Sequence, residues 1–537
     1  MASVLADRLI HRFNSLETGL ASHKARLKEI AEYFQPERSM GFGADFTSDD
    51  DRAKIFDSTP EDCLENLAAF THTLLTPSTQ MWSYVGMEGV QEEELPAEEK
   101  EWLDIVSRKM SDKFNSERLG FHNSVHEFFL DYPSFGTAAF FVDEEDGEPR
   151  FECLPIDNIR FSENSKKIVD TVYRTITMTA RQIVEKWPEG AGVTLTEVSL
   201  KDPERRYKVL HVIEPRKKFK EDAVRGKDMP IASYYIALDT KKTLHESGYH
   251  EMPIMVARWS KISGSVWGRG IGQKSLPDVR VLNAMNRSSL IAGEKAADPT
   301  TLLPHDGFIS PYSSDGGATN YYRASLDMKD KVITIGSDAD LNALLAFIDK
   351  RQGALRKMWL NDKILEVGGP QKTATEILEA TKARMNILGP VGSRVQPEFL
   401  GPLVNRVFRI MYRNGEFPEA PESIVNAELK VSYISPITRA QKQVEAEAFQ
   451  QALTYLAPMV QAQPQMMRNF DFDEIARDTQ ALFGYPAKYL KDRQKVAKED
   501  QAAAEEAQAQ KNMADASNVL TVAGQAKDLN EVKQQAA

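Results

Sequence analysis

Cysteine, long apolar runs and positive charge are all scarce in this sequence, and each scarcity excludes a class of protein. The two cysteines, Cys63 and Cys153, are too few for a disulfide framework and are interpreted as ordinary thiols in a reducing compartment. No apolar run approaches the roughly 18 residues that a membrane-spanning helix needs. Charge appears by Asp7, too early for the apolar stretch of a signal peptide.

The shortage of positive charge bears on nucleic acids. Lys and Arg number 67 against 79 Asp and Glu, which gives a net charge of −12. A protein that grips nucleic acid over a broad surface is usually basic, because its affinity comes from neutralised phosphates. This composition would instead suit a channel through which DNA slides, although composition alone does not show that a channel exists.

What is present is ordinary globular material. Hydrophobic residues make up 42% and charged residues 27% of 537 residues, enough apolar side chain to bury a core. The length predicts about three or four domains, or one elongated subunit of several parts.

Recognisable catalytic motifs are missing or incomplete. There is no Gly-x-Ser-x-Gly and no Cys-x-x-Cys, and the acidic run at 143–146 lacks calcium-loop spacing. The strongest candidate for an enzymatic motif is Gly268-Arg269-Gly270-Ile271-Gly272-Gln273-Lys274-Ser275. It resembles a phosphate-binding loop, but Gln273 occupies the position of the second glycine, where the backbone must approach the phosphates. We interpret this run as a glycine-rich hinge before a helix, with Gly268, Gly270 and Gly272 as the hinge residues.

A histidine pair is the other candidate site. His122 and His126 stand four residues apart on an expected helix, with Glu127 beside them. Two histidines on one helical face can hold a metal, but the order differs from His-Glu-x-x-His and no third ligand is evident. We therefore favour an amphipathic helix with polar histidines at its edge, and expect neither metal nor cofactor.

Helical periodicity dominates the N-terminal part and the second half. It predicts helices whose limits are 2–34, about 58–75, 97–117, 121–131, 276–296, 338–360 and 373–413, the last interrupted near Gly389-Pro390. Residues 298–337 are expected to be irregular. From 490 to 537 there is neither aromatic residue nor proline, which fits either a helix packed against its own copies or a frayed tail.

The middle of the chain changes period. Short runs of β-branched and aromatic residues predict strands, with one helix at 180–187 among them. The expected strands are 138–142, 150–156, 169–178, 207–214, 231–238 and 253–260. The fold class is therefore expected to be α+β and mainly α.

Three groups of motifs together resemble the portal, or head-to-tail connector, proteins of short-tailed double-stranded-DNA bacteriophages. The first group is Ile55-Phe56-Asp57-Ser58-Thr59, Asn66-Leu67-Ala68-Ala69, Leu74-Leu75-Thr76-Pro77 and Trp82. The second is Arg258-Trp259, Trp267-Gly268-Arg269-Gly270, Leu276-Pro277-Asp278-Val279, Leu282-Asn283 and Asp298-Pro299. The third is Thr373-Ala374-Thr375-Glu376, Leu388-Gly389-Pro390-Val391, Leu400-Gly401-Pro402-Leu403, Arg406-Val407-Phe408 and a loop at 415–421. Their order over residues 1–435 makes the match specific, although Trp267 stands where tyrosine is expected.

The resemblance implies a subunit built from a wing, a two-helix stem, a clip, a tunnel loop and a helical crown, assembled as a closed ring of typically twelve copies. The implied limits are 1–265 for the wing, 266–297 for the hinge and first stem helix, 298–337 for the clip, 338–360 for the second stem helix, 361–372 for the tunnel loop, 373–437 for a further wing part with a long helix and a strand, and 438–537 for the crown.

The resemblance also implies a function. Such a ring would sit at one vertex of the capsid in the virion, after assembly in the host cytoplasm, as a conduit for genome packaging and ejection. Implied partners are the terminase large subunit, tail adaptor and tail tube proteins, major capsid and scaffolding proteins, and double-stranded DNA bound without sequence preference. No enzymatic activity and no membrane insertion are expected.

Site residues follow from the same resemblance. Channel contact is assigned to Lys363, Glu366 and Lys372 of the tunnel loop. Docking of tail adaptor or terminase is assigned to Tyr312, Tyr321, Tyr322 and Arg323 of the clip, with clip core or packing between subunits as the alternative for these aromatics. The stem charges suit ion pairs between subunits, or plain solvated surface; they are Asp278, Arg280, Arg287, Glu294, Asp340, Asp349, Arg351, Arg356 and Lys357. Two alternatives stay open: a nucleotide-driven packaging enzyme that uses 268–275, and another virion structural protein.

Overall fold

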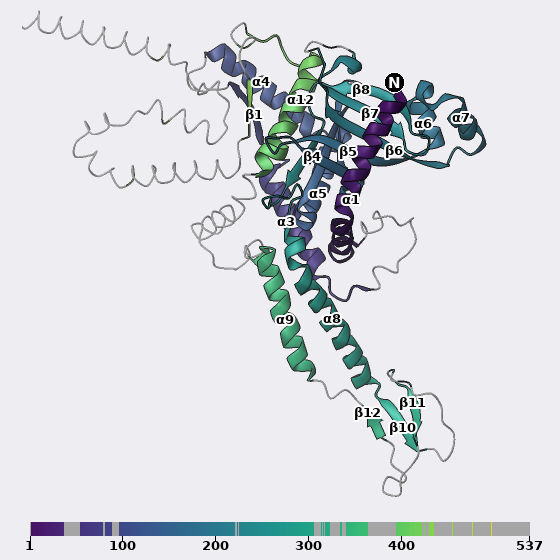
Figure 1. Ribbon diagram of the computed structural model, residues 1–537. Coiled ribbons are helices and arrows are strands. Elements are labelled where there is room, and N and C mark those ends of the chain that lie inside the picture. The colour runs from purple at the N-terminus through teal and green to yellow at the C-terminus, as the bar shows by residue number, and fades with distance from the viewer. Residues whose placement is uncertain are drawn as a thin grey trace, which may run out of the picture. The chain divides into compact units, whose positions relative to one another are not determined.

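The fold was analysed in a computed structural model of the chain. The structure describes residues 2–36, 54–78, 81–87, 96–220, 223, 225–304, 313, 315, 317–322, 333–335, 340–362, 394–421, 424 and 429–433, and the single residues 454, 475 and 496. The chain divides into two compact units, residues 1–88 with 102–436 and residues 89–101 with 437–537. Nearly all described residues belong to the first unit, and they form a mixed, helix-rich α/β fold (Figure 1).

Helices form the N-terminal part, as the sequence predicts. They are α1 (Ala2–Phe34), α3 (Thr59–Leu75), α4 (Ala97–Phe114), a 3₁₀ turn (Glu117–Leu119) and α5 (Phe121–Phe135). The helix α3 begins with proline in its first turn, where a missing N–H costs nothing. The helix α5 runs four residues past its expected end, through Pro133, and stops at Gly136, whose φ of 74° is left-handed.

The middle of the chain forms two antiparallel sheets. A three-stranded sheet has the order β3-β2-β9, and a five-stranded sheet has the order β4-β5-β6-β7-β8. The strands are β2 (Thr137–Glu145), β3 (Glu148–Leu154), β4 (Ile159–Glu163), β5 (Val169–Thr179), β6 (Arg206–Pro215), β7 (Ile231–Ala237), β8 (Lys242–Tyr249) and β9 (Ile254–Arg258). All six strands expected in this region are confirmed.

Two strands and one helix of this region were missed. The strands β4 and β8 are the edges of the five-stranded sheet, and edge strands carry polar residues that hide the alternation of a half-buried strand. The sequence predicted a single helix here, but α6 (Ala180–Lys186) is followed by α7 (Pro188–Lys201). Gly190 and Gly192 near the start of α7 weaken its helical pattern.

Helices cover both faces of the five-stranded sheet. On one face, Ala6 and Leu9 of α1 pack on Leu210 of β6 and its neighbours. On the other face, α6 and α7 pack on Val209, the preceding residue of the same strand, through side chains such as Trp187. Adjacent strand residues point to opposite faces, so the buried pair Val209-Leu210 marks a strand enclosed on both sides.

The next part of the chain is a helix pair joined by a small sheet. The helix α8 (Ile271–Ala297) leads into β10 (Thr300–Pro304), β11 (Thr319–Tyr322) and β12 (Ile333–Ile335), and α9 (Leu341–Met358) follows. The strand order is β11-β10-β12, with β10 and β11 parallel. The expectation of wholly irregular structure at 298–337 is therefore wrong, and α8 begins five residues earlier than predicted.

Residues 394–433 return to the body. They form a π-helical turn (Gln396–Leu400), α12 (Gly401–Arg413) and β13 (Leu429–Tyr433), which pairs antiparallel with β1 (Ser83–Met87). Phe399 of the π-helical turn stacks on Phe128 of α5, with ring centroids 4.0 Å apart. Among the helices of the described ranges, none combines the length and the apolar character needed to cross a membrane.

Candidate functional site

The junction between α5 and α8 is made of backbone against backbone. A Cβ at Gly268 would lie 1.9 Å from the oxygen of Gly136, and a Cβ at Gly270 would lie 2.3 Å from the oxygen of Pro133. Gly272 is equally close to the same end of α5, with Ser134 O at 2.4 Å. No larger residue fits at these positions without a backbone shift. The three expected hinge glycines therefore lie in one tightly packed crossing, and their role as a hinge stays a prediction.

Two polar side chains of the same run, Gln273 and Ser275, are engaged within the fold, whereas Arg269 and Lys274 are exposed. Gln273 Nε2 donates to the carbonyl of Phe135 at 3.1 Å. The buried Ser275 Oγ donates to the carbonyl of Ile271 at 2.9 Å and accepts from Trp359 Nε1 of the α9 end at 3.2 Å. The backbone face that a phosphate-binding loop would offer to a nucleotide is covered by α5. These contacts argue against the nucleotide-binding alternative.

Asp57 ties both paired helices to the segment before α3. Its Oδ2 accepts from Asn286 Nδ2 of α8 at 2.6 Å and from Gln352 Nε2 of α9 at 2.7 Å. Its Oδ1 accepts from the backbone N–H of Thr59 at 2.8 Å. Asp57 belongs to the first motif group, but the sequence alone predicted no role for it. An acidic residue directly before a helix start was the available signal, but its two partners lie more than 200 residues away.

Beyond this junction the helix pair exposes large apolar side chains, namely Val281, Leu290, Ile291, Leu345 and Phe347. At 100° per residue, Val281 and Leu290 point to opposite sides of α8, and Leu345 and Phe347 point to nearly opposite sides of α9. No residue of α8 after Leu282 is buried. Each helix therefore offers apolar surface on two sides.

Several of the expected stem charges are already paired within one subunit. Arg351 Nη1 lies 3.3 Å from Asp278 Oδ1, which links α9 to α8. Arg280 pairs with Glu29 of α1. Asp340 accepts from the backbone N–H of Ala343 at 3.1 Å and caps α9. Ion pairs between subunits stay a prediction for the remaining charges, which are Arg287, Glu294, Asp349, Arg356 and Lys357.

The small sheet carries part of the expected docking set. Tyr321 and Tyr322 are the last residues of β11, paired in register with Leu303 and Pro304 of β10. The side chain of Tyr321 is 48% exposed. The other two expected residues, Tyr312 and Arg323, lie outside the described residues. The structure therefore brings one accessible tyrosine of the set onto a sheet edge, and the docking role stays a prediction.

The expected channel residues Lys363, Glu366 and Lys372 also lie outside the described residues. What is described is the start of that segment. Asn361 is buried, and its Nδ2 donates to the carbonyl of Cys63 on α3 at 2.8 Å. The segment therefore leaves the body from a fixed point at the end of α9.

The histidine pair of α5 gains a third member from α3. His72 Nε2 and His122 Nδ1 are 3.1 Å apart, and His122 Nε2 lies 2.9 Å from Asn115 Oδ1. The amide oxygen can only accept, so His122 donates through Nε2 and accepts through Nδ1 from His72. Burial, with His122 and His126 nearby, lowers the pKa of His72 to about 4. Burial also lowers the pKa of His122. His72, the third histidine of this group, is found only in the tertiary structure.

Nowhere in the described ranges are three or more His, Cys, Asp or Glu side chains placed to hold a metal ion. The two cysteines are both free and buried, and burial raises the pKa of Cys63 to about 12.

Comparison with known proteins assigns the class. The family model described as bacteriophage head to tail connecting protein matches residues 6–490, so the chain belongs to this family. It is a structural connector of a tailed phage, as the motif groups predicted.

Two curated relatives extend over most of the chain. One is the "Portal protein" of Salmonella phage epsilon15, 24% identical over 538 residues, which cover 96% of this chain and 94% of that protein. The other is the "Probable portal protein" of Bordetella phage BPP-1, 26% identical over 483 residues, which cover 88% of this chain and 86% of that protein.

Proposed function

We propose that this chain is the portal protein of a short-tailed phage, a closed ring at one capsid vertex through which the genome is packaged and later ejected. The family and the names of both relatives support this function. The observation that carries the ring is the apolar surface on two sides of α8 and α9, because a subunit in a ring has a neighbour on each side.

The described elements fit the implied parts. The body up to β9 corresponds to the wing, α8 and α9 to the stem, and the sheet β11-β10-β12 to the clip. The proposed tunnel loop at 361–372 begins with the described residues Asn361 and Asp362, and the proposed crown at 438–537 lies almost wholly outside the described residues. The ring has typically twelve copies in this family and would meet terminase, tail adaptor and tail tube proteins, and capsid and scaffolding proteins. It resides in the virion after assembly in the host cytoplasm.

Ring assembly is tested on the purified chain. Native mass spectrometry and negative-stain images should show closed rings at micromolar concentration. Leu290→Ser with Phe347→Ser should reduce assembly while the subunit stays folded, because both side chains are exposed in the single subunit. The control is Ile168→Ser, which removes a similarly exposed side chain from the body. Monomer alone for the unaltered chain, or equal loss in the control, would contradict the proposal.

The absence of enzymatic activity is tested separately. Ser275 is already engaged by Ile271 and Trp359, so purified rings should not hydrolyse ATP. Turnover that disappears in Lys274→Ala would revive the nucleotide-driven alternative.

The channel role of the tunnel loop is tested by Lys363→Ala with Lys372→Ala. Rings of charge at a low-dielectric constriction act on DNA, not on ring closure. Rings and procapsids should form normally, while packaged genome length or retention falls. Failure of ring formation would make the segment an assembly element instead.

A further inference from the structure

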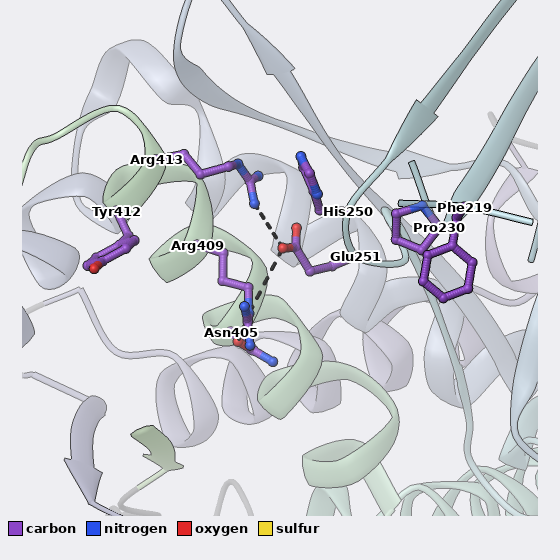
Figure 2. A pocket seen from close by; sticks show the side chains of 8 residues that line it. All are labelled: Phe219, Pro230, His250, Glu251, Asn405, Arg409, Tyr412 and Arg413. Carbon is purple, nitrogen blue, oxygen red and sulfur yellow. Dashed lines mark hydrogen bonds and ion pairs between the residues drawn. The ribbon is translucent and has the colours of Figure 1, made fainter. Parts of the chain in front are cut away.

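One end of the five-stranded sheet carries an arginine-rich, aromatic pocket of about 510 Å³. It is enclosed by loop residues such as Phe219 and His250 and by the α12 residues Arg409, Tyr412 and Arg413. Figure 2 shows the two arginines reaching toward Glu251, with Phe219 and Tyr412 on opposite sides of them. About half of each aromatic side chain is exposed, 50% for Phe219 and 53% for Tyr412.

The pocket has more positive than negative charge. Glu251 alone is shared by Arg406 at 3.3 Å, Arg413 at 2.8 Å and Arg409 at 3.9 Å. Arg413 also lies 3.4 Å from Glu144. Among the side chains that line the pocket, two guanidinium groups, those of Arg409 and Arg413, face one carboxylate, that of Glu251. The exposed lysines beside Phe219 add to the excess, namely Lys217, Lys218 and Lys220.

The opposite chemistry lies on α7. Val193, Glu197 and Leu200 share one face of the helix, at spacings of four and three residues. All three are exposed, Val193 by 75% and Leu200 by 83%. Gly192 interrupts α7 with a left-handed φ of 65°. In the part after this kink, Leu195 and the partly buried Val198 pack into the core of the subunit. The outer face of α7 therefore presents a carboxylate between two apolar side chains, and none of these three side chains contributes to the core of the subunit.

Figure 1 shows α7 and α12, which carry the two surfaces, on opposite sides of the five-stranded sheet. The helix α7 leads directly into Arg206, the first residue of β6, whereas Phe219 follows Pro215, its last residue. His250 follows the end of β8 at that second end, because Tyr249 pairs with Ile231 and Ile231 with Pro215. Ten residues of strand separate the ends by about 33 Å.

We propose that the outer face of α7 in one copy of this chain docks into the arginine-aromatic pocket of the next copy. Glu197 meets Arg409 and Arg413, while Val193 and Leu200 pack on Tyr412 and Phe219. A repeated head-to-tail contact needs complementary surfaces on opposite sides of one subunit, and these surfaces have that placement. Aromatic and arginine side chains are also those most enriched at interface hot spots. The inference rests on the ring of the proposed function and names a contact that closes it.

The experiment swaps the charges in two variants. Glu197→Arg and Arg409→Glu each place like charges in every contact, and each should raise the subunit concentration for half assembly by about tenfold or more. In an equal mixture, alternating subunits restore opposite charges in every contact, so assembly should return. Arg409 tolerates the change, because it is exposed and its ion-pair distance is 3.9 Å. Thermal unfolding of both variants checks their folding, and Lys166→Glu on an exposed turn is the matched control.

The outcomes separate this contact from the ring itself. If the unaltered chain stays monomeric, both the proposed ring and this contact are wrong. If the chain forms rings and both single variants assemble normally, the ring stands and this contact is wrong. Arg409→Glu that assembles normally but loses affinity for double-stranded DNA would make the pocket a phosphate-binding surface and overturn the proposal. Single defects that the mixture does not rescue would also overturn it.

Discussion

The helices α5 and α8 meet at one crossing but differ in how they are stabilised. α5 has nine buried residues among its 15, with aromatic neighbours from β2, β3 and the π-helical turn. α8 has 27 residues and six buried ones, all between Ile271 and Leu282. The difference teaches that α5 is buried by other described elements of the body, whereas the outer half of α8 is left exposed by the residues that the structure describes.

The largest expected difference comes from removing one charge in the body and one in the helix pair of α8 and α9. Arg258 is 3% exposed; its backbone N–H and guanidinium donate to Glu398 at 2.8 and 2.7 Å, and it also pairs with Glu163. Arg258→Ala removes a buried guanidinium from two half-buried carboxylates, although Glu163 keeps Lys261 and Glu398 keeps Arg394 as partners. It should cost about 3 kcal/mol, the low end for breaking a buried ion pair. Arg351→Ala breaks an exposed pair in the helix pair and should cost about 0–1 kcal/mol. Urea unfolding followed by tryptophan fluorescence measures both, and equal losses would refute the contrast.

Glycine replacement should give opposite signs in the two regions. Gly268→Ala forces a Cβ against the backbone of Gly136 and should cost about 1–3 kcal/mol or more. Gly293→Ala on the outer half of α8 meets nothing within 4 Å and should stabilise that helix by about 0.5–1 kcal/mol. Thermal unfolding of the pair of variants decides. A stabilising Gly268→Ala would mean that the crossing is looser than described.

The joint between the two regions rests on one carboxylate. Asp57→Asn replaces one carboxylate oxygen with an NH2 donor. That donor must face either the donor amides of Asn286 and Gln352 or the backbone N–H of Thr59, so the change should cost about 1–3 kcal/mol. Hydrogen exchange should show the loss as faster exchange of α9 amides near Gln352, with α5 unchanged. Slower exchange in α9, or faster exchange in α5 alone, would place the effect elsewhere.

The last expected effect concerns pH, is absent at neutral pH and belongs to the body. The folded pKa of His72 is lowered to about 4 from 6.5, so the unfolded chain binds its proton first as pH falls. The contribution of this group is complete above about 6.5 and is lost as pH drops toward about 4. His72→Gln should flatten the fall in urea midpoint over this window, whereas His11→Gln on the exposed face of α1 should not. Identical profiles for all three proteins would exclude the histidine cluster as a cause.

Periodicity predicted the helices and the central strands of the sheets well, because those elements bury one or both faces. Periodicity failed for elements whose secondary structure depends on the neighbouring strands or helices. The edge strands β4 and β8 have few apolar residues, and β10 to β12 pair only with one another. The start of α8 was placed at 276 because Pro277 favours a first turn; in the structure it begins at Ile271, against the end of α5.

The candidate sites divide in the same way. The glycine run 268–272 was found from its composition, since closely approaching backbones need glycine. The partners of Asp57, the third histidine and the pocket around Glu251 come from segments up to hundreds of residues apart. No local pattern records such a meeting. The family resemblance predicted the connector function because it rests on the order of many motifs along the chain, each of which is weak alone.

The crossing of Gly268 to Gly272 with α5 also determines how far the other end of α8 would move for a given tilt. It lies at one end of a helix of 27 residues, which is about 40 Å long at 1.5 Å per residue. A tilt of about 5° at this crossing would displace the far end of α8 by about 3.5 Å on that length, close to the spacing of one strand residue. If these glycines act as the predicted hinge, they would be the pivot of α8, and a small change in how they pack on α5 would be magnified at the sheet that β10 begins.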